Sequence, residues 1–129
     1  MRKETDCKMQ KFIIEGRLPS LNEYIDKCRF NKYAGGKFKK QHQEYIEWHI
    51  KSSKIKPMKC VDITYRFYEK NKRRDKDNVS SFARKIINDA LQTAGILEND
   101  NWQCIGILKD EFYIDKENPR IEVELYERE

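Results

Sequence analysis

The feature that most constrains the fold is an apolar stripe with helical spacing in the second half of the chain. Its members are Val79, Phe82, Ala83, Ile86, Ile87, Ala90, Leu91 and Ala94. Steps of three and four residues place side chains on one face of an α-helix. Gly95 follows the last member directly and is a typical helix stop. We therefore expect a helix from about Asn78 to Ala94 that buries one face.

The strand pattern is clearest before this helix. Four apolar residues alternate with polar ones, which predicts a half-buried strand; they are Val61, Ile63, Tyr65 and Phe67. Shorter apolar runs predict further strands at residues 12–18, 102–108 and 121–125. Asn118-Pro119 supplies the turn before the last of these strands.

Two more helices are expected between the first two strands. Ser20 is a candidate N-cap, and Glu23 stands three residues later in the capping-box position. Apolar residues follow at helical spacing as far as Cys28. The pair Gly35-Gly36 is expected to end this helix, and a second helix is expected over residues 37–52.

The resulting order, β-α-α-β-α-β-β, predicts one α+β domain over residues 1–129, with helices packed against a small mixed β-sheet. The chain has no apolar run near the roughly 18 residues that a membrane span requires. The first ten residues lack the apolar segment of a secretory signal. We therefore expect a cytoplasmic protein with no membrane partner.

The four cysteines are scattered along the chain, at Cys7, Cys28, Cys60 and Cys104. They form no Cys-x-x-Cys pair and have no paired histidines nearby, so their spacing argues against a structural zinc site. Free thiols in a reducing compartment are the expected state.

The charge is unevenly distributed. Residues 1–96 carry 23 basic and 12 acidic side chains, whereas residues 97–129 carry 4 basic and 10 acidic side chains. A basic body with an acidic final segment suits a polyanionic partner. A solvated charged surface would have the same composition, and composition alone does not decide between the two.

Two carboxylates stand just before the long helix, at Asp75 and Asp77. In an extended backbone, residues two apart point to the same side, so both carboxylates are expected to face one point. Two facing carboxylates repel each other unless a cation lies between them, and Mg²⁺ or Mn²⁺ accepts such oxygen ligands. On pattern alone, a helix N-cap at Asp77 and Asn78 is the more common use of these residues, and the two roles are compatible.

Two residues further along could join this pair. Asp100 would complete an acidic trio if the topology returned it to the pair, although the segment from Glu98 to Asn101 also has the chemistry of a simple turn. Lys85 lies on the polar side of the long helix. It could face a phosphate near the carboxylates, but an ordinary surface pair with Asp89, four residues on, is the favoured reading.

Several of these residues belong to a wider pattern. Its parts are Leu18-Pro19-Ser20-Leu21-Asn22-Glu23-Tyr24, Arg74-Asp75-Lys76-Asp77-Asn78, Lys85, Asp89-Ala90-Leu91, Ala94-Gly95 and Asn99-Asp100. This pattern resembles the RusA-type Holliday junction resolvases and covers nearly the whole chain, from about Lys11 to Tyr126. Members of that family are homodimeric, Mg²⁺-dependent endodeoxyribonucleases that nick four-way DNA junctions symmetrically.

The resemblance implies roles for particular residues. Asp75, Asp77 and Asp100 match the family's catalytic, metal-binding aspartates, and Lys85 matches its helix lysine. Compared with the best-known member, this chain is about four residues longer between Asn78 and Asp89, roughly one helical turn. Anchoring on Asp77 would place Ser81 at the lysine position, but a serine cannot offer a cation. The implied cofactor is Mg²⁺, with Mn²⁺ as a substitute and no organic cofactor.

The expected DNA contacts lie in two basic segments. The first leads into the acidic pair; its candidates are Lys70, Lys72, Arg73, Arg74 and Asn78. The second, residues 27–40, has six cations and no acids and is expected to be a flexible loop at Gly35-Gly36; its candidates are Lys32, Lys37, Lys39 and Lys40. Two other functions remain open: a branched-DNA-binding protein without catalysis, and a nuclease for flaps or other branched DNA.

Overall fold

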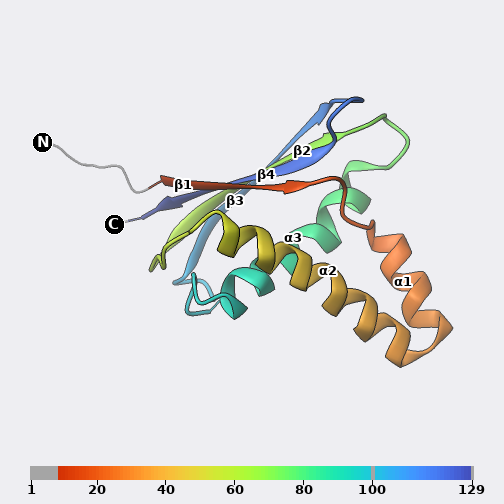
Figure 1. The fold of residues 1–129 in the computed structure, drawn as a ribbon, viewed down its shortest axis with the longest axis horizontal. Coiled ribbons are helices and arrows are strands. Elements are labelled where there is room, and N and C mark those ends of the chain that lie inside the picture. The colour runs from red at the N-terminus through yellow and green to blue at the C-terminus, as the bar shows by residue number, and fades with distance from the viewer. Residues whose placement is uncertain (1–8, 100, 129) are drawn as a thin grey trace, which may run out of the picture.

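The computed structural model describes residues 9–99 and 101–128. The elements in chain order are β1 (Met9–Glu15), α1 (Leu21–Phe30), α2 (Lys32–Ser52), β2 (Val61–Glu69), α3 (Lys76–Thr93), β3 (Ile105–Ile114) and β4 (Arg120–Glu127). This order is the predicted one, and it forms a mixed α+β fold. Figure 1 shows the helices gathered on one side of the sheet.

The four strands lie in the order β1-β4-β2-β3. Strand β4 pairs antiparallel with both β1 and β2, whereas β2 and β3 are parallel and are connected through α3. The parallel register joins Val61 to Ile105 at one end and Glu69 to Ile114 at the other. Helix α3 therefore begins at the Glu69 end of the sheet and returns the chain to the Val61 end (Figure 1).

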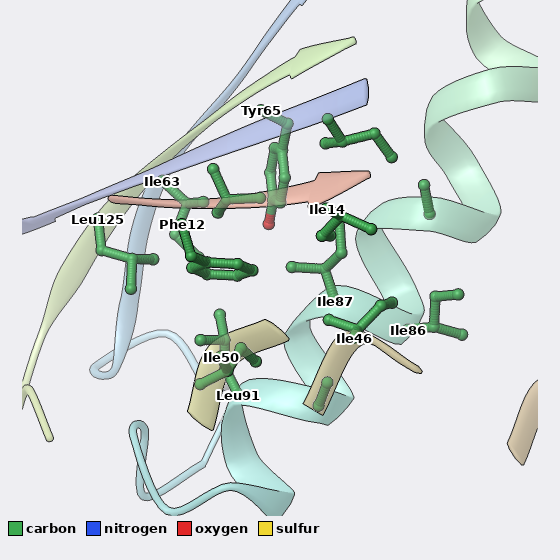
Figure 2. Close-up of a cluster of buried hydrophobic side chains, with 14 of the residues drawn as sticks. Phe12, Ile14, Ile46, Ile50, Ile63, Tyr65, Ile86, Ile87, Leu91 and Leu125 are labelled. Atoms are coloured by element: carbon green, nitrogen blue, oxygen red, sulfur yellow. The ribbon is translucent and has the colours of Figure 1, made fainter. Parts of the chain in front are cut away.

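One hydrophobic core lies between the sheet and the helices. Figure 2 shows Phe12 and Ile14 of β1 and Tyr65 of β2 facing Ile86 and Ile87 of α3. The predicted stripe of α3 is buried from Val79 to Leu91, and the alternation predicted for β2 appears as alternating buried and half-buried residues. Truncating one of these core side chains to alanine should cost about 2–5 kcal/mol.

Several predicted strand boundaries are wrong: β1 begins at Met9 and not at Phe12, and β3 continues to Ile114, six residues past the predicted end at Leu108. At two other boundaries a turn residue sets the actual limit. Strand β1 ends at Glu15, not at Leu18, because Gly16 adopts a left-handed backbone with φ 81°. Strand β3 begins at Ile105, not at Trp102. The side-chain oxygen of Asn101 accepts hydrogen bonds from the backbone of Gln103 and Cys104, each at 3.0 Å, and holds those residues in a turn.

The predicted break at Gly35-Gly36 is also wrong. Both glycines lie inside α2, which begins at Lys32, and the break between helices falls at Asn31. A β-carbon on Gly35 would lie 2.5 Å from the sulfur of Cys28, so glycine here permits close packing of α1 on α2. Residues 27–40 are therefore a helix-turn-helix corner and not a flexible loop.

Two general properties bear on the expectations above. Cys28, Cys60 and Cys104 are free thiols, and Cys7 lies outside the described residues. Within the two described ranges, none of the helices combines the length and the apolar character needed to cross a bilayer.

Candidate functional site

The candidate acidic pair lies where the chain leaves β2 and enters α3. Asp75 is the N-cap residue of α3 with an extended backbone (φ −65°, ψ 145°), and its side chain makes no capping hydrogen bond. Asp77 already lies in the first helical turn. The expectation of an extended backbone through both residues is therefore wrong, because the helix begins at Lys76. Both aspartates are exposed, and the Asp75 carboxylate is not used for capping.

The alternative that Asp77 or Asn78 caps α3 is wrong as well, because the cap position belongs to Asp75. The Asn78 side chain instead accepts a hydrogen bond from the backbone of Asn22 at 2.9 Å, at the start of α1. The predicted capping box of α1 is confirmed, since Ser20 and Glu23 each accept a hydrogen bond from the other's backbone, at 3.2 and 3.1 Å. Asn78 thus joins the beginnings of two helices beside the acidic pair.

Arg74 fixes the loop that precedes Asp75. Its guanidinium donates two hydrogen bonds to the carboxylate of Glu69, at 3.0 and 2.9 Å. A third guanidinium hydrogen bond reaches the carbonyl of Leu18 at 2.9 Å. Glu69 is buried, and the bidentate geometry restricts both partners. Although Arg74 was predicted to contact DNA, its side chain is used to connect β2, the loop and the turn before α1.

A pocket of about 480 Å³ opens next to Asp75. Its lining comes from the end of β2, the loop, the start of α3 and the end of β3; the residues are Glu69, Asn71, Lys72, Arg74, Asp75, Lys76, Val79, Phe112, Tyr113 and Ile114. The Lys76 ammonium lies 5.4 Å from the ring centroid of Phe112. Sequence reasoning missed Lys76 and the end of β3, because only the parallel pairing of β2 with β3 brings Phe112 to this place.

Three cations predicted to bind DNA belong to the same loop, between β2 and α3. Lys70, Lys72 and Arg73 are exposed, and none of them forms an ion pair with another described residue. Lysine and arginine side chains that are free of carboxylates are available to phosphates. Together with the N-terminus of α3, whose backbone dipole favours negative charge, they make this end of the molecule suitable for a phosphate backbone.

Lys85 forms the surface pair that its spacing allowed. Its ammonium lies 3.3 Å from the Asp89 carboxylate, and Lys39 of α2 reaches the other oxygen of that group at 3.0 Å. Lys85 is eight positions after Asp77 in the helix, which corresponds to about 12 Å along the axis. Ser81, the other residue considered for this role, donates its hydroxyl to the backbone carbonyl of Asp77 at 2.5 Å.

Asp100, the third predicted carboxylate, lies outside the described residues. Its neighbours Asn99 and Asn101 follow the C-terminus of α3, and Asn101 contacts the residues that lead into β3. Helix α3 has 18 residues and is about 27 Å long, so these neighbours lie at the far end of the sheet from Asp75. In the described part of the chain, no three His, Cys, Asp or Glu side chains gather to hold a metal ion.

The second basic segment forms the corner between α1 and α2. Lys32, Lys37 and Lys40 are exposed and make no ion pair within residues 9–99 and 101–128, whereas Lys39 is half-buried against Asp89. This segment therefore offers cations along a rigid helical corner, with Lys39 the exception among the four candidates.

The uncovered face of the sheet has a different character. Arg66 pairs with Glu111 and Glu124, and Arg120 pairs with Asp115 and Glu122. Hydrogen bonds from Tyr113, Lys109 and Arg66 lower the pKa of Glu111 to about 2. Burial alone would raise the pKa of Glu122, but Lys11 and Arg120 hold it below its usual range. The arginines of this face are occupied by carboxylates, so it is a poor surface for a polyanion.

Comparison with known proteins identifies no relative, because no family model matches the chain and no curated protein matches it.

Proposed function

We propose that the chain is a metal-dependent endodeoxyribonuclease of the RusA type that resolves four-way DNA junctions by paired nicks. The observation that carries this proposal is the position of Asp75 at the start of α3, where it lines a pocket and follows three unpaired cations of the loop. Asp77 is exposed two residues further on, in the first turn of the helix. Carboxylates surrounded by cations suit a reaction whose substrate is itself anionic. The sequence pattern that resembles RusA-type enzymes supports the choice of DNA junctions as substrate.

Asp75 and Asp77 supply the oxygen ligands that the proposed Mg²⁺, or Mn²⁺ in its place, accepts. Mg²⁺ is usually held by one or two protein carboxylates together with water and substrate phosphate. Asp75 has an exposed carboxylate without a capping bond, and Asp77 supplies a second one within the same turn. When bound, the metal would neutralise charge on the phosphate and lower the pKa of an attacking water. Lys72 and Lys76 line the pocket beside Asp75 and would hold the phosphate in place.

The proposed homodimer offers a role for Asp100, whose described neighbours Asn99 and Asn101 lie at the far end of the sheet from Asp75 within one subunit. Strand β3 is an edge strand of the sheet. Two large apolar side chains are exposed there: Ile107 in the strand is 63% exposed, and Trp102 in the preceding turn is 98% exposed. Two such edges paired antiparallel about a two-fold axis would bring the Ile114 end of one subunit beside the Ile105 end of the other. We therefore propose that the segment of residues 98–101 completes the acidic site of the partner subunit.

The direct test is a cleavage assay with three labelled DNA substrates: a four-way junction, a flap and a linear duplex of the same sequence. The proposal predicts paired nicks in the junction with Mg²⁺ and none with a chelator. Preferential cutting of the flap would favour the broader branched-DNA nuclease. Tight junction binding without cutting in either Mg²⁺ or Mn²⁺ would favour the non-catalytic alternative and overturn the enzymatic proposal.

A further inference from the structure

The corner between α1 and α2 ends in two aromatic side chains that face solvent. Phe30 is the last residue of α1, and Tyr33 is the second residue of α2. Each of the two residues is 79% exposed. Figure 1 shows this corner projecting away from the sheet. We call residues 30–33 the tip. Two large rings at a projecting point do not serve the core of this chain.

The tip is held in a fixed shape. Asn31 caps both helices: its backbone N–H bonds to Lys27 at 3.5 Å, and its side chain accepts from Ala34 at 2.7 Å. The close approach of Gly35 to Cys28 locks the two helices together behind it. Rings presented on such a preformed corner lose little conformational freedom on binding.

Cations lie along the same corner. The Lys32 ammonium lies 5.8 Å from the Tyr33 ring centroid, and Lys27 lies at the same distance from the ring of Phe38. Arg29 and Lys37 are exposed and have no ion-pair partner among the residues described. Residues 27–40 contain no acidic side chain. This combination of rings and free cations matches a ligand that has both π-faces and negative charges.

We propose that the tip binds DNA at unpaired bases: Phe30 and Tyr33 stack on the bases, while Arg29, Lys32 and Lys37 bind the adjoining phosphates. In a continuous duplex the base faces are covered by their neighbours, so aromatic stacking selects strands that are open or single. The cations alone would bind any DNA. This inference rests on the proposed function and deepens it, because it names the feature of branched DNA that the protein recognises.

The test compares the wild type with the double variant Phe30→Leu/Tyr33→Leu, which keeps apolar bulk and removes both rings. Affinities for a single-stranded oligonucleotide, a junction with unpaired bases at its centre and a linear duplex are measured at equal salt. We expect a loss of at least about fivefold for the first two and less than twofold for the duplex. Trp48→Ala is the matched control, since Trp48 is 64% exposed on α2 but remote from the tip, and it should change none of the three.

Equal losses on all three DNAs, or no loss on any, would overturn the inference. A change in the mass of the free protein by light scattering would also overturn it, because the rings would then serve a contact between subunits. The assay measures binding alone, so it tests base stacking independently of nuclease activity. Conversely, a double variant that binds and cuts junctions like the wild type would refute the tip's role and leave the proposed nuclease intact.

Discussion

Arg74 and Glu69 form a bidentate ion pair, at 3.0 and 2.9 Å, that holds the loop before Asp75 against the end of β2. We predict that Arg74 acts by positioning and not by contacting phosphate. Arg74→Lys keeps the charge but loses the two-bond geometry. Junction cleavage should fall at least about tenfold while junction affinity changes less than threefold.

Arg73 provides the matched control for this prediction. It is exposed and has no ion-pair partner in the described chain, so Arg73→Ala should weaken binding and its salt dependence without changing the rate at saturating DNA. If Arg74→Lys lost affinity and kept its maximal rate, Arg74 would be a phosphate contact, and the positioning role would be wrong.

A second prediction concerns which lysine assists the acidic pair. Lys76 lines the pocket beside Asp75, whereas Lys85 pairs with Asp89 about 12 Å along the helix from Asp77. Lys76→Ala should lower the single-turnover cleavage rate by about 10²-fold, because it removes a cation from the proposed phosphate site. Lys85→Ala should stay within about twofold, as for an exposed ion pair. The reverse ranking would restore the role that the family pattern implies for Lys85.

The charged face of the sheet predicts a pH dependence of stability. Glu111, Glu122 and Glu124 have pKa values below their usual range, so the stability they add is complete above their unfolded pKa of about 4.3. It is lost as the pH falls toward the folded pKa, which for Glu111 is about 2. Urea unfolding of the wild type should therefore show a steep loss of stability across this interval.

The variant Arg66→Met removes the cation shared by Glu111 and Glu124, and its stability should fall less steeply over the same interval. Lys116→Met is the control, because it removes one exposed lysine that forms no ion pair with any described residue. Equal slopes for the wild type and Arg66→Met would contradict the assignment.

The composite site makes a prediction that separates it from a site within one subunit. Asp75→Asn and Asp100→Asn should each be inactive alone. Mixed and allowed to exchange subunits, they should form heterodimers with one intact site, giving about a quarter of the wild-type sites. If each site lay within one subunit, every mixture would stay inactive. Light scattering of the wild type should report twice the mass of one chain, and a monomer would contradict the dimer directly.

The fold was accessible from sequence wherever burial imposes a period. The stripe of α3, the alternation of β2 and the capping box at Ser20 all predicted their elements. The corner between α1 and α2 could not be predicted from sequence, because a glycine such as Gly35 usually indicates a helix break. Only its contact with Cys28 in the folded chain explains why it lies inside a helix. In the proposed site, the acidic pair and the basic loop were predicted from residue type and position, and their role stays a prediction. The ion pair of Arg74 with Glu69 depends on tertiary structure, and so do the contribution of Phe112 and the distance between Asp75 and Asn99.

The most direct test of the central claim is junction cleavage by Asp75→Asn and Asp77→Asn in Mg²⁺, with binding measured on the same samples. Each substitution removes a negative charge near the proposed phosphate site, so affinity should be retained or rise. We predict that both variants bind the four-way junction at least as tightly as the wild type and cut it at less than about 10⁻³ of its rate. Cutting by either variant at near wild-type rate would contradict a catalytic site at the start of α3.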